Sequence, residues 1–345
     1  MKTKHISSTD ALSQQTLKEA ASLLQSGGLV VFPTETVYGL GGDATQAQSS
    51  KKIYAAKGRP SDNPLIIHIA EPRDAERYAY VCPTYERLAN AFMPGPLTVI
   101  IPKRDIIPAE TTGGLDTVAV RCPSHPVAHA LIEACGVAIA APSANRSGKP
   151  SPTCAAHVAD DMDGRVDMII DGGECEIGLE STIVKIDGED SVTLLRPGAI
   201  TYDALCMVVS TVNIAAAVTD KLSENERPLS PGMKYRHYAP DAPLILLDGE
   251  QKAVLSFLKQ EQRTKKCAIL CYDEESAHLQ QNLLFPVGPT DDIATQSRVL
   301  FRHLREADRL CPDVIYAHLP PAKGLGLALY NRMIRAAAFT VCRIP

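Results

Sequence analysis

The sequence LVVFPTETVYGL, at residues 29–40, joins an apolar run directly to a group of hydroxyl and carboxyl side chains. The apolar part, residues 29–32, lies between glycine and proline, which is typical of a short buried β-strand. A helical pattern over about residues 13–25 precedes it and ends at Gly27-Gly28, a common stop for helices. A helix, a buried strand and polar residues in this order indicate an α/β sheet, which commonly places ligands at the ends of its strands.

Further short apolar runs extend this organisation to about residue 210. Helical patterns separate several of the runs, but the last runs follow one another closely. A twisted mixed sheet with helices packed on it therefore fits better than a strictly alternating parallel sheet. We predict an α/β fold with a first domain over residues 1–210. The predicted strands lie at residues 65–69, 97–101, 117–120, 137–140, 168–170, 181–186 and 192–195, and predicted helices at 47–56, 84–92 and 127–135.

The pattern fades at residues 211–240, which we interpret as a linker. The last part of this segment, SPGMKYRHYAP at residues 230–240, is rich in side chains that form hydrogen bonds and predicts a lid rather than a passive spacer. A second, smaller α/β domain is predicted over residues 241–345, with a parallel, Rossmann-like sheet. Its predicted strands lie at residues 244–247, 267–271 and 314–315, and its helices at 252–260, 291–310 and 327–338.

Composition excludes several classes of protein. The chain has 345 residues, of which 45% are hydrophobic, enough for two cores without a disulfide or metal staple. A net charge of −5 argues against a surface devoted to nucleic acid. The ten cysteines are scattered without a C-x-x-C motif, which favours free thiols. No signal peptide or membrane-spanning run is evident, so we expect a cytoplasmic protein.

The usual nucleotide-binding motifs are absent. The glycine clusters at residues 39–42 and 324–326 lack the third glycine of a dinucleotide fingerprint, and SGKP at residues 147–150 has proline where a phosphate-binding loop needs Ser or Thr. Polar residues collect instead in four segments at the ends of predicted strands. These segments are residues 33–40, residues 57–64 leading into a strand with His68, Arg121 at the end of its strand, and residues 142–152.

Each segment also has a purely structural interpretation. Thr-Glu-Thr can cap a turn, Lys57 and Arg59 can complement a helix dipole, and a histidine among apolar residues is usually a core residue. In combination they favour a binding pocket. Lys57 with Arg59, and Ser143 with Asn145, provide donors for a phosphate, whereas an arginine at a strand end seeks a small carboxylate.

Six strings in this region closely resemble the threonylcarbamoyl-AMP synthases built on a YrdC-like domain. They are FPTETVYGLG, KGRPSDNPL, PGPLTVI, GLDTVAVRCP, AAPSAN and GLESTIV. The resemblance covers about residues 15–210, and SPGMKYRHYAP with the region after it resembles the longer, two-domain form. It implies synthesis of threonylcarbamoyl-AMP from L-threonine, bicarbonate and ATP with release of pyrophosphate. The product would serve the N6-threonylcarbamoyladenosine modification of tRNA.

The resemblance also implies roles for individual residues. The catalytic set is Lys57, Arg59, Ser143 and Asn145. The ATP-binding set is Arg59, Asn63, Thr117, Ser143, Ser151, Arg196, Tyr235 and His237. The threonine-binding set is Thr34, Thr36, Tyr38, His68, Arg121, the backbone at Ala141, and Ser181. No metal ligand of the protein is implied, and Mg²⁺ is expected to accompany ATP.

The resemblance implies partners as well, and two other functions remain as alternatives. The tRNA threonylcarbamoyl transferase machinery is the expected recipient of the product, with weak tRNA contact by this chain, and no membrane partner is expected. One alternative is an RNA-binding module without catalysis, which the acidic composition disfavours. The other is a carbamoyltransferase of hydrogenase maturation. Those chains carry C-x-x-C zinc fingers, which this sequence lacks.

Overall fold

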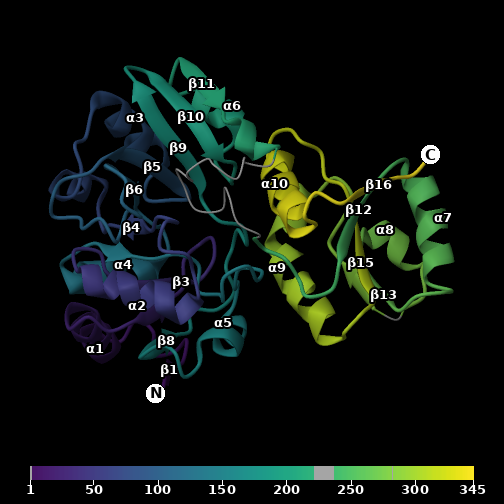
Figure 1. The fold of residues 1–345 in the computed structure, drawn as a ribbon, viewed down its shortest axis with the longest axis horizontal. Helices are drawn as coiled ribbons and strands as arrows, with labels where there is room; N and C mark the ends of the chain where they lie inside the picture. Colours follow the sequence, from purple (N-terminus) through teal and green to yellow (C-terminus); the bar gives the residue numbers. More distant parts are fainter. Residues whose placement is uncertain (1, 221–236, 282) are drawn as a thin grey trace. The chain divides into compact units, whose positions relative to one another are not determined.

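The computed structural model describes residues 2–220, 237–281 and 283–345. The chain forms two compact units, of which the first comprises Met1–Ser147 and Ser151–Lys234 and the second Gly148–Pro150 and Tyr235–Pro345. Both units are α/β structures, and the predicted fold class is confirmed (Figure 1). No helix in the described ranges is both long and apolar enough to cross a lipid bilayer.

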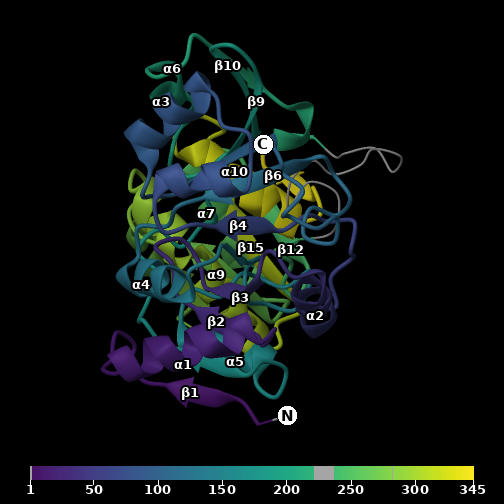
Figure 2. The same ribbon diagram turned by 90° about the vertical axis from the view of Figure 1, so that its left-hand side faces the viewer.

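The first unit is built on an eleven-stranded mixed sheet. Strand pairs β1–β8, β2–β8, β4–β6, β5–β9 and β10–β11 are parallel, and the remaining neighbours are antiparallel. Figure 2 shows the succession from β1 at the bottom to β10 at the top. In sheet order the strands are β1 (Lys4–Ile6), β8 (Met168–Ile170), β2 (Val30–Phe32), β3 (Gly39–Asp43), β7 (Ile139–Ala140), β4 (Ile66–His68), β6 (Thr117–Arg121), β5 (Leu97–Pro102), β9 (Thr182–Gly188), β10 (Ser191–Arg196) and β11 (Thr211–Ile214).

Helices pack on both faces of this sheet. On one face, α1 (Gln14–Gln25) and α4 (Pro126–Cys135) share an apolar cluster with Phe32 and Ile139. The other face carries the main core, to which four helices contribute. These are α2 (Ala47–Lys57), α3 (Pro83–Phe92), α5 (Ala155–Met162) and α6 (Tyr202–Cys206), and two 3₁₀ turns, η1 (Pro72–Arg77) and η2 (Ala216–Val218), complete the unit.

Alternation along the central strands decides which side chains are left for a site. Ile67 of β4 and Val120 of β6 belong to the main core. Their neighbours His68 and Arg121 therefore point to the opposite face, because successive residues of a strand alternate between faces. On that face the central and later strands share a small apolar cluster to which, among the described residues, no α-helix contributes. Polar side chains can therefore occupy this part of the sheet.

The structure differs from the sequence prediction at residues 211–220. The prediction placed them in a linker, but Thr211–Ile214 form β11, which pairs in parallel with β10. The turn η2 follows and buries Ala217 and Val218. This part of the linker prediction is wrong, because β11 is an edge strand of four residues whose side chains are mostly exposed. Residues 221–236 lie outside the described residues.

The second unit contains a five-stranded, fully parallel sheet with the order β14-β13-β15-β12-β16. Helix α7 packs on one face of it, and α9 and α10 lie on the other side in Figure 1. The elements are β12 (Leu244–Asp248), α7 (Gln251–Glu261), β13 (Cys267–Cys271), α8 (Asp273–Ser276), β14 (Leu284–Pro286), α9 (Ile293–Arg309), β15 (Val314–His318), α10 (Gly326–Ala336) and β16 (Val341–Arg343). The predicted helices and main strands of this unit are present, whereas α8, β14 and β16 were not predicted.

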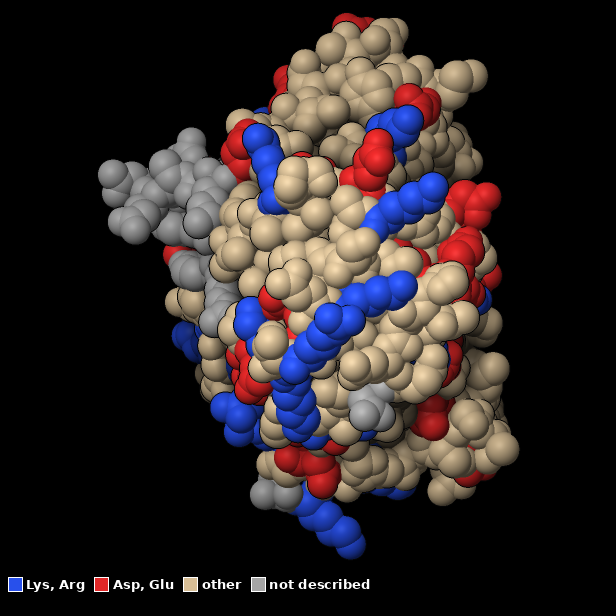
Figure 3. All heavy atoms as spheres, turned by 90° about the vertical axis from the view of Figure 1, so that its right-hand side faces the viewer, with Lys and Arg blue, Asp and Glu red and all other residues tan. Residues whose placement is uncertain are grey.

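Charges of both signs are mixed on the surface in Figure 3. Lys and Arg side chains lie among Asp and Glu side chains on that face. All ten cysteines are free.

Candidate active site

Lys57, Ser143 and Asn145 form one connected group. Lys57 is the last residue of α2 and is 4% exposed. Its ammonium donates to the backbone carbonyls of Ser143 and Asn145, the second at 2.5 Å. The Ser143 hydroxyl donates to the Asn145 side-chain carbonyl at 2.5 Å. The lysine therefore fixes the loop after β7, and the loop presents the serine and asparagine that were predicted to hold phosphate.

Arg59 and Asn63 shape the next loop. Gly58 lies between Lys57 and Arg59 with φ of 63°, a left-handed conformation that ends α2. The Arg59 guanidinium donates to the carbonyl oxygens of Asn63 at 3.2 Å and Pro64 at 3.0 Å. Asn63 is buried, and its Oδ1 atom has no hydrogen-bond partner among the described residues. This loop leads into β4 at the same end as Thr117, the first residue of β6.

Arg121 forms a buried ion pair with Glu35. The guanidinium Nη2 lies 2.7 Å from Glu35 Oε1, and both side chains are 5% exposed. His68 pairs with Arg121 in the register of β4 and β6, so the two side chains are neighbours on one face. Burial, together with the positive charge of Arg121, lowers the pKa of His68 to about 3. The imidazole beside the arginine is therefore neutral at pH 7.

The three predicted residues in the segment after β2 make different hydrogen bonds. Thr34 Oγ1 accepts from the backbone N–H groups of Thr36 and Val37 and lies 2.8 Å from the Thr36 hydroxyl, so Thr34 organises the turn. Thr36 is fully buried beside it. The Tyr38 hydroxyl donates to the carbonyl of Gly173 at 2.6 Å. Its hydroxyl is thus already committed to the loop after β8.

Ser181 and Arg196 belong to a second polar cluster. The Ser181 hydroxyl lies 2.7 Å from that of Thr98, and the Arg196 guanidinium donates to Ser181 Oγ at 3.1 Å and to its carbonyl at 3.0 Å. Thr98 pairs directly with Arg121 across β5 and β6. Arg196, predicted to bind ATP, therefore lies with the residues predicted to bind threonine. Ser151 is buried and donates to Glu180, the residue before Ser181, at 2.5 Å.

Several of the predicted residues lie at one or the other end of β4. Asn63, Thr117 and the 143–145 loop lie at its N-terminal end, and His68 and Arg121 at its C-terminal end. Ala141, predicted to bind threonine, lies at the N-terminal end of β4, since its N–H donates to the carbonyl of Ile66 at 2.8 Å. Four steps of about 3.3 Å separate Thr117 from Arg121 along β6, or roughly 13 Å.

Tyr235 lies outside the described residues. His237 is described in the second unit, where its ring lies 5.6 Å from that of Tyr238, which stacks on Phe301 of α9 at 5.3 Å. The predicted contacts of Tyr235 and His237 with ATP stay predictions.

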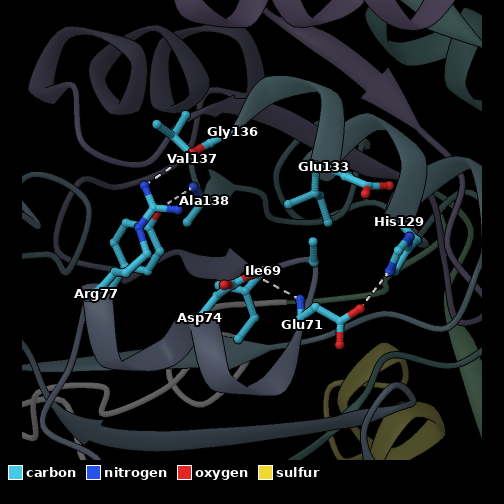
Figure 4. Close-up of a pocket in the computed structure, with 12 residues that line it drawn as sticks. Ile69, Glu71, Asp74, Arg77, His129, Glu133, Gly136, Val137 and Ala138 are labelled. Atoms are coloured by element: carbon cyan, nitrogen blue, oxygen red, sulfur yellow. Dashed lines mark hydrogen bonds and ion pairs between the residues drawn. The ribbon is translucent and has the colours of Figure 1, made fainter. Parts of the chain in front are cut away.

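A separate pocket of about 230 Å³ opens near the start of β7 (Figure 4). In this pocket Glu71 Oε1 lies 3.5 Å from His129 Nε2, and the Arg77 guanidinium donates to the carbonyl of Gly136 at 3.2 Å. None of the predicted site residues lines it. The described residues contain no group of three or more His, Cys, Asp or Glu side chains arranged to hold a metal ion.

Glu35, Thr98 and Glu180 had no role in the sequence prediction. Each contacts a predicted residue that is far away in the sequence. Glu35 and Arg121, for example, are 86 positions apart. A carboxylate directly after a buried apolar strand was the one signal that could have indicated Glu35.

Known proteins share this sequence and fold. A family model described as telomere recombination matches residues 22–198, and one described as the C-terminal domain of threonylcarbamoyl-AMP synthase matches residues 200–338. The threonylcarbamoyl-AMP synthase of Bacillus subtilis is 43% identical over 350 residues, covering 99% of this chain and 100% of that protein. That of Pyrococcus abyssi is 42% identical and covers 97% and 98%, respectively.

A solved structure agrees over the full length. The crystal structure of P. abyssi Sua5 complexed with L-threonine has a TM-score of 0.90 to this chain at 41% identity, covering 100% of both chains. Both domain models and the full-length relatives show that this chain belongs to the threonylcarbamoyl-AMP synthase family, in its two-domain form.

Proposed function

We propose that the two residue groups at the ends of β4 join L-threonine, bicarbonate and ATP into threonylcarbamoyl-AMP and release pyrophosphate. The observation that carries this proposal is that the two groups lie at opposite ends of the neighbouring parallel strands β4 and β6. One group offers the donors of the 57–63 and 143–145 loops, and the other offers Arg121 beside a neutral imidazole. Family membership supports the same reaction over the RNA-binding and carbamoyltransferase alternatives.

The reaction needs two bond-forming steps. The amino group of threonine adds to the carbon of bicarbonate, and water and a proton leave to give a carbamate. A carbamate oxygen then attacks the α-phosphorus of ATP in line, and the bond to the β-phosphate breaks to release pyrophosphate. Threonine, bicarbonate and ATP all carry negative charges that must be brought together, so positioning and charge neutralisation should supply most of the acceleration. We assign the phosphates to Arg59, Ser143 and Asn145 and the threonine carboxylate to Arg121.

Lys57 has a distinct place in this mechanism. The Lys57 ammonium donates to the carbonyls of Ser143 and Asn145. We therefore assign Lys57 to positioning their loop and to offsetting part of the phosphate charge. Mg²⁺ would enter as the ATP complex, since this ion retains several waters and binds largely through substrate phosphates.

The chemistry of the product indicates what kind of enzyme must receive it. A mixed anhydride of a carbamate and a phosphate is hydrolysed by water, so an acceptor enzyme must use it promptly. We therefore propose that a cytoplasmic tRNA threonylcarbamoyl transferase receives it, and that this chain touches tRNA weakly at most.

The test measures pyrophosphate release from Mg²⁺-ATP by the full-length protein while each substrate is omitted in turn. Release should require both L-threonine and bicarbonate. Release that continues unchanged without threonine would rule out the proposed reaction. An RNA-binding module would release no pyrophosphate in any mixture, and a carbamoyltransferase would use carbamoyl phosphate without needing threonine.

A further inference from the structure

We propose that Glu35 and Arg121 act as a pair that selects the zwitterionic form of the amino acid, with Glu35 binding the ammonium group and Arg121 the carboxylate. This inference rests on the proposed function and assigns a substrate contact to Glu35.

The geometry of the ion pair leaves one acceptor and one donor open. Glu35 and Arg121 share a single contact, Nη2 to Oε1 at 2.7 Å. Among the described residues, neither Glu35 Oε2 nor Arg121 Nε has a hydrogen-bond partner, and both atoms are buried. A purely structural Arg–carboxylate pair commonly closes both contacts of the fork. Unpaired buried polar atoms are costly, so this pair is arranged for a further partner.

The two open atoms match the two ends of an α-amino acid. Arg121 Nε is a donor that suits a carboxylate, and Glu35 Oε2 is an acceptor that suits an ammonium group. At neutral pH an α-amino acid carries both charges. Its carboxylate and ammonium groups would therefore form, with Arg121 and Glu35, an arrangement of four alternating charges.

Charge balance makes this arrangement selective. The pair is neutral as a whole and nearly inaccessible to water, with 5% exposure of each side chain. A zwitterion keeps the site neutral, whereas a simple carboxylic acid would bury a net negative charge, which is unfavourable in a poorly solvated site. The adjacent His68 is neutral and adds no charge to this balance.

The experiment compares two ligands by calorimetric titration. L-threonine is the zwitterion, and 3-hydroxybutanoate is the same molecule without its amino group. The wild-type protein should prefer threonine. Glu35→Gln removes the negative charge with little change of shape, and should weaken threonine binding by about 10–100-fold, as expected for a lost charged hydrogen bond. It should strengthen 3-hydroxybutanoate binding, because Arg121 then has an uncompensated charge.

Glu275→Gln is the matched control, since Glu275 is 2% exposed and lies 3.0 Å from His318 in the second unit. This variant should keep the wild-type ratio of the two affinities, and ATP binding should survive in both variants. An unchanged ratio in Glu35→Gln, with ATP still bound, overturns the role of Glu35 and leaves the proposed function intact. Failure of threonine to bind the wild-type protein at all would instead contradict the proposed function.

Discussion

At the residue scale, Lys57 has a structural role in the loop and a proposed role in catalysis. Its ammonium is buried against two loop carbonyls. Lys57→Met should therefore lower the free energy of unfolding by about 1–3 kcal/mol, because buried acceptors lose a charged donor, and ATP affinity should fall with it. Ser143→Ala should reduce ATP affinity with little loss of stability. Denaturant unfolding and ATP titration of each variant measure the two effects.

Lys52→Met provides the control on the same helix, since Lys52 is exposed and donates to one carbonyl, that of Gly27 at 2.5 Å. It should leave ATP affinity unchanged. A Lys57→Met protein that unfolds like the wild type while losing ATP would show that the lysine acts on phosphate alone.

Candidate residues for the site could be named from the sequence, but the side chains that they contact could not. The spacing of Lys57 with Arg59, and of Ser143 with Asn145, indicated phosphate donors from short segments. The contact of Arg121 with Glu35 depends on how β2 and β6 are placed within the sheet. No local pattern contains that information, because side chains so far apart in the sequence meet only through the strand order.

At the scale of elements, the end of α2 determines where Lys57 and Arg59 point. Gly58 has φ of 63°, and a Cβ atom there would meet nothing within 4 Å. Gly58→Ala should therefore cost about 1–2 kcal/mol of stability through backbone strain alone. Because this residue lies between Lys57 and Arg59, we also expect ATP affinity to fall, by about tenfold or more, as the donors are displaced.

Gly136 is a close match, since it ends α4 with φ of 69° and equally open surroundings. Gly136→Ala should lose similar stability and retain ATP affinity. Equal ATP affinities in the two variants, measured by titration below their melting temperatures, would show that the α2 turn does not position the site.

Elements with a clear apolar period were predictable, and those without one were not. The strand β3 reads GLGGD and is buried, but three glycines give it no apolar alternation. The strands β1 and β11 lie at the two edges of the sheet, and they are short and mostly exposed. In these cases neighbouring strands, rather than local preference, decide the conformation.

At the scale of the whole molecule, the two α/β units were predictable from their separate periodic patterns. The boundary was not, because β11 and η2 depend on pairing with β10 and burial against the first unit. Full-length relatives with both units indicate that the two-domain chain is the unit to study, so the decisive experiment uses the complete protein.

That experiment identifies the nucleotide product formed from ¹³C-bicarbonate, L-threonine and Mg²⁺-ATP by mass spectrometry within seconds of mixing. We predict a single new adenylate whose mass contains AMP, one threonine and one ¹³C atom, formed in equal amount to pyrophosphate. An adenylate without the ¹³C atom, or ADP with phosphate as the products, would contradict the synthesis of threonylcarbamoyl-AMP by this chain.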